Sequence, residues 1–159
     1  MAYWIPRGVP DDLEEVGRRV VQAFGIRERP FHIEFFRLAE GTLVALEVNL
    51  RQPGGLTVDM FDYANDMDFY RAWAEVVTAG TTEVDLTRPY CCLYAGRKAG
   101  RHYRLSHEEV LARFAGSIVQ HERIDDVFSA AIGNYGYIMR GPDLTPLQAA
   151  AEAIQALAS

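Results

Sequence analysis

The sequence predicts an α+β fold, in which an antiparallel β-sheet is covered by packed α-helices. Segments with apolar residues at helical spacing are interspersed with segments in which apolar and polar residues alternate, as in strands. No internal repeat is present along the 159 residues. A short turn between two alternating segments indicates a β-hairpin, the simplest antiparallel connection. With 49% hydrophobic and 24% charged residues, the composition is that of one ordinary domain, so residues 1–159 are expected to form a single domain.

The N-terminal third predicts a helix followed by the hairpin. Asp11 and Asp12 begin a segment with apolar residues at helical spacing, and Gly25 ends it. Those apolar residues are Leu13, Val16, Val20, Val21 and Phe24. Residues 31–38 and 42–50 then alternate in steps of two, which predicts two strands joined by a two-residue turn at Glu40 and Gly41.

The middle of the chain predicts a second helix and another strand. Asn65 or Asp66 is expected to cap this helix, and Gly80 is expected to end it. Its buried stripe consists of Phe69, Tyr70, Trp73, Val76 and Val77. Residues 89–96 follow as a predicted strand.

The C-terminal part predicts two helices around two extended segments. Ser106 and Glu109 have the spacing of a capping box, so a third helix is expected to follow Ser106. Residues 118–124 and 128–139 are expected to be extended, the second of them bent by its glycines. Thr145 and Pro146 are expected to begin a C-terminal helix.

Charge and hydropathy argue against two classes of partner. The net charge of −6 and the lack of a basic cluster disfavour nucleic acid and anionic membrane surfaces. No segment approaches the ~18 apolar residues needed to cross a bilayer, and the N-terminus does not resemble a secretion signal. Cys91 and Cys92 point to opposite faces of a predicted strand and are not expected to form a disulfide. A cytoplasmic protein is therefore expected.

The chemically informative residues lie in the hairpin. A two-residue turn at Glu40 and Gly41 would place Glu34 directly opposite Glu47. Asn49 and Arg51 follow Glu47 in steps of two, so they are expected on the same face of the strand.

Two opposed carboxylates need a partner that offsets their repulsion. At ~5 Å and an effective dielectric constant of ~20, they repel by ~3 kcal/mol. A divalent cation removes this repulsion, and carboxylate and amide oxygens suit Mg²⁺ or Mn²⁺, which also take phosphate oxygens. The pattern leaves another interpretation open, since polar residues on one face of a strand are common without any ion.

The segments His32-Ile-Glu-Phe-Phe36 and Leu46-Glu-Val-Asn-Leu-Arg-Gln-Pro-Gly-Gly55 resemble the signature of ATP-grasp ligases, a superfamily that includes biotin carboxylase, carbamoyl-phosphate synthetase and D-alanine–D-alanine ligase. The resemblance implies that Glu34, Glu47 and Asn49 bind Mg²⁺ and, through it, ATP. It also implies that Arg51 stabilises the transferred phosphoryl group. The implied reaction converts a small carboxylate into an acyl phosphate, which a nucleophile then captures.

Further residues have weaker predicted roles. Gly54 and Gly55 would allow a substrate to approach the backbone, and Asp59 would line the acceptor side, although an ordinary turn explains the glycines equally well. His32 shares the face of the acids and could contact nucleotide, although a structural role is expected.

The resemblance concerns only the C-terminal subdomain of the ATP-grasp fold. Nothing before Glu34 is long enough to supply the N-terminal substrate domain or the lysine-bearing lid of the family. The chain alone is therefore expected to be inactive or incomplete, with a homodimer or a partner chain providing the missing lid. The alternative is a non-catalytic oligomerisation or regulatory module that keeps this fold.

Overall fold

The computed structural model describes residues 1–158 and divides into two compact units. The first, called the sheet unit, contains residues 1–7, 59–67 and 86–158. The second, called the hairpin unit, contains residues 8–58 and 68–85. The prediction of a single domain over 1–159 stays a prediction, and each of the two compact units is described by itself below.

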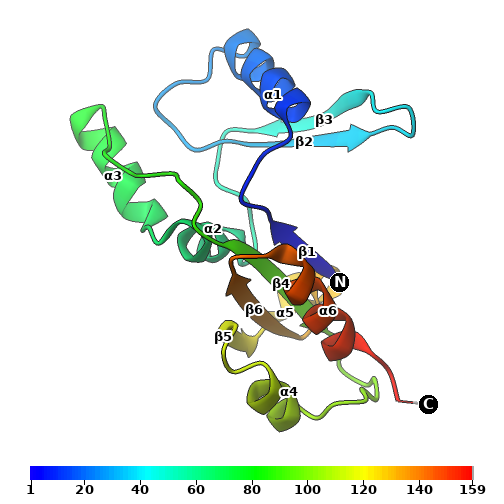
Figure 1. The fold of residues 1–159 in the computed structure, drawn as a ribbon. Helices are drawn as coiled ribbons and strands as arrows, with labels where there is room; N and C mark the ends of the chain where they lie inside the picture. Colours follow the sequence, from blue (N-terminus) through cyan, green and yellow to red (C-terminus); the bar gives the residue numbers. More distant parts are fainter. Residues whose placement is uncertain (159) are drawn as a thin grey trace. The chain divides into compact units, whose positions relative to one another are not determined.

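The sheet unit is built on a four-stranded sheet (Figure 1). Its strands are β1 (Ala2–Ile5), β4 (Cys91–Arg97), β6 (Tyr135–Gly141) and β5 (Ile118–Arg123), in that spatial order. All neighbouring pairs are antiparallel. The predicted α+β class with an antiparallel sheet and packed helices is confirmed.

The principal core lies on one face of this sheet, where α4 (His107–Arg113) and α6 (Leu144–Gln155) supply apolar side chains. The buried residues of this cluster are Cys91, Leu93, Ala95, Val110, Tyr137, Met139, Leu147, Ala150, Ala151 and Ile154. Alternation along β4 directs Cys92 and Tyr94 to the opposite face, and both are fully buried. The two cysteines are free, as the sequence predicts.

Two glycines allow Tyr94 and the neighbouring backbone to lie close to the sheet. A Cβ atom on Gly136 would stand 2.5 Å from the Tyr94 ring, and one on Gly96 would stand 1.9 Å from the carbonyl oxygen of Ile132. The Tyr94 hydroxyl donates to that same oxygen at 3.0 Å. Close approach, and not chain bending, is therefore the reason for glycine at these positions.

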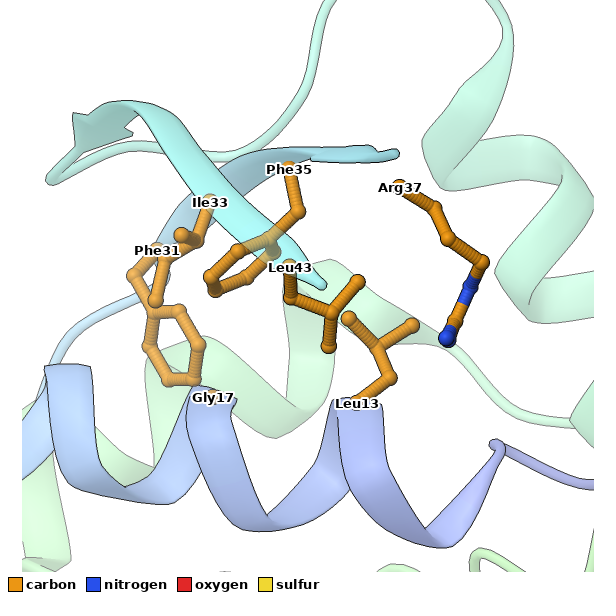
Figure 2. Close-up of a pocket in the computed structure, with 7 residues that line it drawn as sticks. All are labelled: Leu13, Gly17, Phe31, Ile33, Phe35, Arg37 and Leu43. Atoms are coloured by element: carbon orange, nitrogen blue, oxygen red, sulfur yellow. The ribbon is translucent and has the colours of Figure 1, made fainter. Parts of the chain in front are cut away.

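The hairpin unit contains α1 (Asp11–Ala23), β2 (His32–Arg37), β3 (Leu43–Asn49) and α3 (Phe69–Ala79). Leu13 and Gly17 of α1 line a cavity of about 420 Å³ together with apolar hairpin residues (Figure 2). Arg37 also ties the strand to the helix, because its Nη1 and Nη2 atoms donate to the Asp12 carboxylate at 2.5 and 3.1 Å. This hydrogen-bonded pair lowers the pKa of Asp12. One face of the hairpin is thereby occupied by α1.

The predicted helices at the N-terminus, in the middle and after Ser106 are confirmed, but the predicted cap of α3 is wrong. Asp68, and not Asn65 or Asp66, accepts from the N–H of Arg71, while Gly80 adopts the left-handed conformation expected after the helix. The complete capping box of Ser106 and Glu109 is present.

Three elements differ from the sequence prediction. The helix α2 (Thr57–Asn65) was not predicted, and β1 is too short for its alternation to be recognised. The predicted extended segment 128–139 is wrong in its first half, which forms α5 (Asp126–Ile132). Asp125 caps α5 by accepting the N–H of Val127. This local hydrogen bond decides the conformation despite the strand-favouring residues that follow.

The C-terminal helix is present but begins earlier than predicted. Asp143 occupies its N-cap position, and Pro146 lies in the first turn. Within residues 1–158, no helix has the length and apolar character required to span a membrane.

Candidate functional site

The hairpin presents two different faces. Ile33, Phe35 and Leu43 point towards α1 (Figure 2). Because side chains alternate along a strand, His32 and Glu34 project from the opposite face. The acidic residues of the hairpin therefore lie on the face that α1 leaves uncovered.

Glu34 lies directly opposite Glu47, and His32 lies opposite Asn49. The predicted pairing of the two acids is thus present. It arises differently from the prediction, because the two-residue turn at Glu40 and Gly41 is wrong.

The loop contains three residues, since the N–H of Leu38 donates to the oxygen of Thr42. Arg37 consequently pairs with Leu43, and Phe35 pairs with Ala45. A β-bulge then leaves Leu46 without a partner and returns Glu47 to the position opposite Glu34.

Three side chains converge closely enough to hold one ion. A ring nitrogen of His32 and carboxylate oxygens of Glu34 and Glu47 all lie within 4.8 Å of one another. His32 Nε2 is 3.6 Å from Glu34 Oε1. Asn49 Nδ2 donates to Glu47 Oε1 at 2.5 Å, which leaves the amide oxygen of Asn49 free for a further bond. The donor set that the structure brings together is therefore two carboxylates and one imidazole, with Asn49 beside them.

The carboxylates of the cluster have no Arg or Lys partner in the described chain. Among residues 1–158, no Arg or Lys forms an ion pair with Glu34 or Glu47. In addition, His32 Nδ1 is buried and has no hydrogen-bond partner in the described chain. Two carboxylates without an Arg or Lys partner, beside an imidazole, fit a divalent metal ion, which accepts both kinds of ligand.

The structure places Arg51 and the two glycines beyond the strand. β3 ends at Asn49, one residue before the predicted end of the strand, so strand alternation does not determine the side on which Arg51 lies. The Arg51 guanidinium donates to the carbonyl oxygen of Gln52 at 2.9 Å. Gly55 has φ of 64°, a left-handed conformation, and no atom approaches within 4 Å of a Cβ built on Gly54.

Asp59 belongs to α2 and to the sheet unit. Burial, assisted by the charge of Glu122, raises the pKa of its carboxyl group. On the same helix, the Tyr63 hydroxyl donates to Gln120 Oε1 at 3.0 Å. Within the sheet unit, this part of α2 therefore contacts β5.

Sequence reasoning missed two features. His32 was expected to be structural, whereas the structure makes it a third member of the acid cluster. In the sheet unit, His107 and His121 gather with Tyr135 and Tyr137, and His107 Nδ1 lies 2.9 Å from the Tyr137 hydroxyl. The two tyrosines are two residues apart on β6 and therefore lie on the same face of the sheet. No pattern in the sequence indicates that the two histidines pack beside them.

Two solved structures resemble this chain. The crystal structure of L-amino acid ligase from Bacillus licheniformis aligns with a TM-score of 0.73 and 14% identity over 96% of this chain. The phosphoribosylaminoimidazole carboxylase ATPase subunit from Aquifex aeolicus aligns with a TM-score of 0.60 and 12% identity over 98% of it.

This chain covers 43% and 47% of those two proteins, so it spans less than half of their length. No family model matches its sequence, and no curated protein matches it. The structural likeness shows that the chain shares the fold of part of an L-amino acid ligase and of part of a carboxylase ATPase subunit.

Proposed function

We propose that this chain is the metal- and nucleotide-binding half of an ATP-dependent carboxylate ligase. Glu34, Glu47 and Asn49 would hold Mg²⁺ or Mn²⁺, and through it the phosphates of ATP. The observation that carries the proposal is the direct opposition of Glu34 and Glu47 on the hairpin face away from α1, where no Arg or Lys of residues 1–158 forms an ion pair with either acid. The shared fold with part of an L-amino acid ligase supports it.

The donor set also bears on the choice of metal. Carboxylate and amide oxygens suit Mg²⁺, whereas the added imidazole of His32 favours Mn²⁺ more strongly than Mg²⁺. When bound, the ion would neutralise charge on the ATP phosphates during phosphoryl transfer. The role of the protein is to fix the two acids at a short separation.

Apolar side chains beside the acids support a nucleotide ligand. Phe36 pairs with Val44, and alternation puts both on the face of Glu34. Their exposed fractions are 56% and 44%. Such a surface suits the flat, weakly polar ring of a base, while the acids engage the phosphates through the metal.

Arg51 is proposed to stabilise the transferred phosphoryl group. Its one observed hydrogen bond, to Gln52, leaves other N–H groups of the guanidinium available. A guanidinium can pair with two phosphate oxygens at once, which neutralises charge as it develops.

In the proposed reaction, an oxygen of the substrate carboxylate bonds to the γ-phosphorus of ATP while the bond to the ADP oxygen breaks. An amine or another nucleophile then attacks the carbonyl carbon of the acyl phosphate, phosphate leaves with the bonding electrons, and the amine proton passes to solvent. Catalysis of this kind rests on positioning and charge neutralisation. Gly54 and Gly55 are the proposed substrate contacts.

The complete enzyme is proposed to need a phosphate-binding lid with a lysine. A longer chain, a second copy of this chain in a homodimer, or a different partner chain could supply it. The coverage of less than half of each similar structure supports this incompleteness.

Calorimetric titration with Mg·ATP and Mn·ATP tests the site. Glu47→Ala and Glu34→Gln are expected to weaken binding by about tenfold or more, the loss expected when one charged metal ligand is removed. Glu40→Ala removes an acid from the exposed loop of the same hairpin and serves as the control. His32→Asn should weaken Mn·ATP more than Mg·ATP. Equal binding by the parent chain and both site variants would refute the proposal.

The exposed apolar residues of the hairpin also favour a second candidate, a non-catalytic oligomerisation or regulatory module. Phe36, Leu38, Val44 and Leu46 are each at least 42% exposed. Sedimentation and thermal unfolding with nucleotide discriminate the two. A dimer that Mg·ATP does not stabilise would favour the second candidate, because a ligand of the native state must raise its apparent stability.

A further inference from the structure

The sheet unit contains an open cleft that the proposed ligase site does not use. It has a volume of about 410 Å³ and lies around the end of β4, the turn that follows it, the last residue of β5 and the beginning of β6. All of its lining residues belong to the sheet unit. We call it the arginine–tyrosine cleft, after the residues discussed below.

The charge of this cleft is opposite to that of the whole chain. Its charged lining residues are Arg97, Lys98, Arg101 and Arg123, and none of the described lining residues is Asp or Glu. The chain as a whole carries a net charge of −6. Like charges gathered in one concavity repel each other and raise the local concentration of anions. The cleft is therefore suited to an anionic ligand.

Arg97 gives independent support for a ligand. The residue is only 8% exposed, yet it lines the cleft. Its Nε donates to the carbonyl oxygen of Ile154 at 2.7 Å, but its Nη2 is buried without a hydrogen-bond partner in the described chain. A buried charged donor without an acceptor is costly and uncommon in native proteins. An oxyanion in the cleft would supply the missing countercharge.

The guanidinium is held in place by aromatic rings. Its central carbon lies 4.5 Å from the ring centre of Tyr103 and 5.8 Å from that of Tyr137. These contacts stabilise a cation but do not neutralise it. Arg97 is therefore oriented before any ligand arrives.

The turn after β4 is fixed by side-chain hydrogen bonds. The N–H of Lys98 donates to the Tyr103 hydroxyl at 2.7 Å, and the N–H of Ala99 donates to Asn134 Oδ1 at 2.9 Å. The N–H of Asn134 in turn donates to the carbonyl oxygen of Arg97 at 2.7 Å. A wall that is already ordered loses little conformational entropy on binding.

The remaining wall is aromatic. The rings of His107 and Tyr135 are 4.9 Å apart at 70°, and those of Tyr135 and Tyr137 are 5.2 Å apart. His107, Tyr135 and Tyr137 all line the cleft. Rings beside several cations suit a ligand that combines an oxyanion with a flat ring.

We propose that the arginine–tyrosine cleft binds a small ligand that carries a phosphate or carboxylate group on a planar ring, with Arg97 and Arg123 contacting the oxyanion. None of the residues that line the cleft belongs to the acid cluster of the hairpin, so the proposal neither requires a metal ion nor depends on the ligase proposal.

Calorimetry with phenyl phosphate in the presence of EDTA tests the cleft, because EDTA removes the metal on which the hairpin site depends. Saturable binding by the parent chain is expected. Arg123→Gln is expected to weaken it about tenfold, the loss of one charge-assisted hydrogen bond. Arg113→Gln makes the same charge change on α4, outside the cleft, and is expected to change affinity less than twofold.

Further variants locate the binding site, and further probe molecules identify which chemical group of the ligand it recognises. Arg101→Gln provides a second exposed variant, so the test does not depend on replacing the buried Arg97. Glu47→Ala should bind phenyl phosphate unchanged. Inorganic phosphate measures the contribution of the oxyanion without the ring, and benzoate replaces phosphate with carboxylate.

Tighter binding of phenyl phosphate than of benzoate assigns the site to phosphate esters, and the reverse assigns it to carboxylates. No saturable binding of any of the three probes, equal losses in Arg113→Gln and Arg123→Gln, or loss in Glu47→Ala alone would overturn the proposal.

Discussion

Cys91 and Cys92 are neighbours that lie in two different apolar environments, one on each face of β4. Cys92 is completely buried, and this burial raises the pKa of its thiol to about 12. Because the thiolate is the reactive form, we expect neither cysteine to be alkylated by iodoacetamide in the folded chain at about pH 8. Mass spectrometry should detect both adducts only after denaturation. Rapid alkylation of the native chain would show that β4 is accessible.

Asp59 carries a carboxyl group whose pKa burial raises. Its charged form is therefore disfavoured in the folded state, which lowers stability above the folded pKa but not below the ordinary carboxyl pKa of ~4. We expect Asp59→Asn to raise the unfolding free energy at neutral pH and to lose this advantage as the pH falls towards that value. Thermal unfolding across pH measures the difference, with Glu40→Gln as an exposed control. A gain that is the same at every pH would exclude an electrostatic cause.

For individual residues of the candidate site, some positions can be predicted from the sequence and others cannot. Glu34 and Glu47 are predictable because strand alternation and the signature both select them. His32 escapes because a histidine on a polar face gives no sign of whether its ring nitrogens have partners. The placement of Arg51 stays a prediction, because alternation does not reveal that the strand ends at Asn49.

At the scale of elements, the close approach of Gly96 to α5 permits a sharp test. A Cβ atom there would meet the carbonyl oxygen of Ile132 at 1.9 Å, and backbone cannot move aside as a flexible side chain can. Gly96→Ala is therefore expected to destabilise the chain by about 2 kcal/mol or more. Gly116→Ala, where nothing lies within 4 Å of the added atom, serves as the control. Chemical denaturation compares them, and equal midpoints would contradict the packing described here.

Elements were predictable where a local signal and an apolar pattern agree. The segment from Ser106 has both a capping box and apolar residues at helical spacing, and its helix is present. In α5, the Asp125 cap competes with Val127 and Phe128, which favour strands, so a pattern-based prediction fails. The short β1 depends on its pairing with β4, a contact far along the sequence that no local pattern contains.

On the scale of the whole molecule, burial is distributed unevenly. Nearly all fully buried side chains of the described chain belong to the sheet unit, whereas α1 has no buried residue. Amide exchange follows local opening, so we expect the amides of β4 and β6 to exchange about 100-fold more slowly than those of α1, β2 and β3. Hydrogen exchange measured by mass spectrometry tests this expectation. Saturating Mg·ATP should slow exchange in β2 and β3 if the ligase proposal is correct. Uniform protection without ligand would contradict the difference between the units.

Because of the bulge at Leu46, the hairpin has two possible strand registers, and both place Glu34 opposite Glu47. In the observed register, Leu43 faces α1 and Val44 faces outward; a straight register with a two-residue turn would exchange them, yet Glu34 would still meet Glu47. Glu40→Asn places the sequence Asn-Gly in the loop, which favours that turn. We expect this variant to slip into the straight register, which cross-strand nuclear Overhauser contacts between residues 38 and 43 would reveal. Slippage would change the apolar neighbours of the metal ligands while their spacing stays constant, so this hairpin can alter what it recognises without altering how it holds an ion.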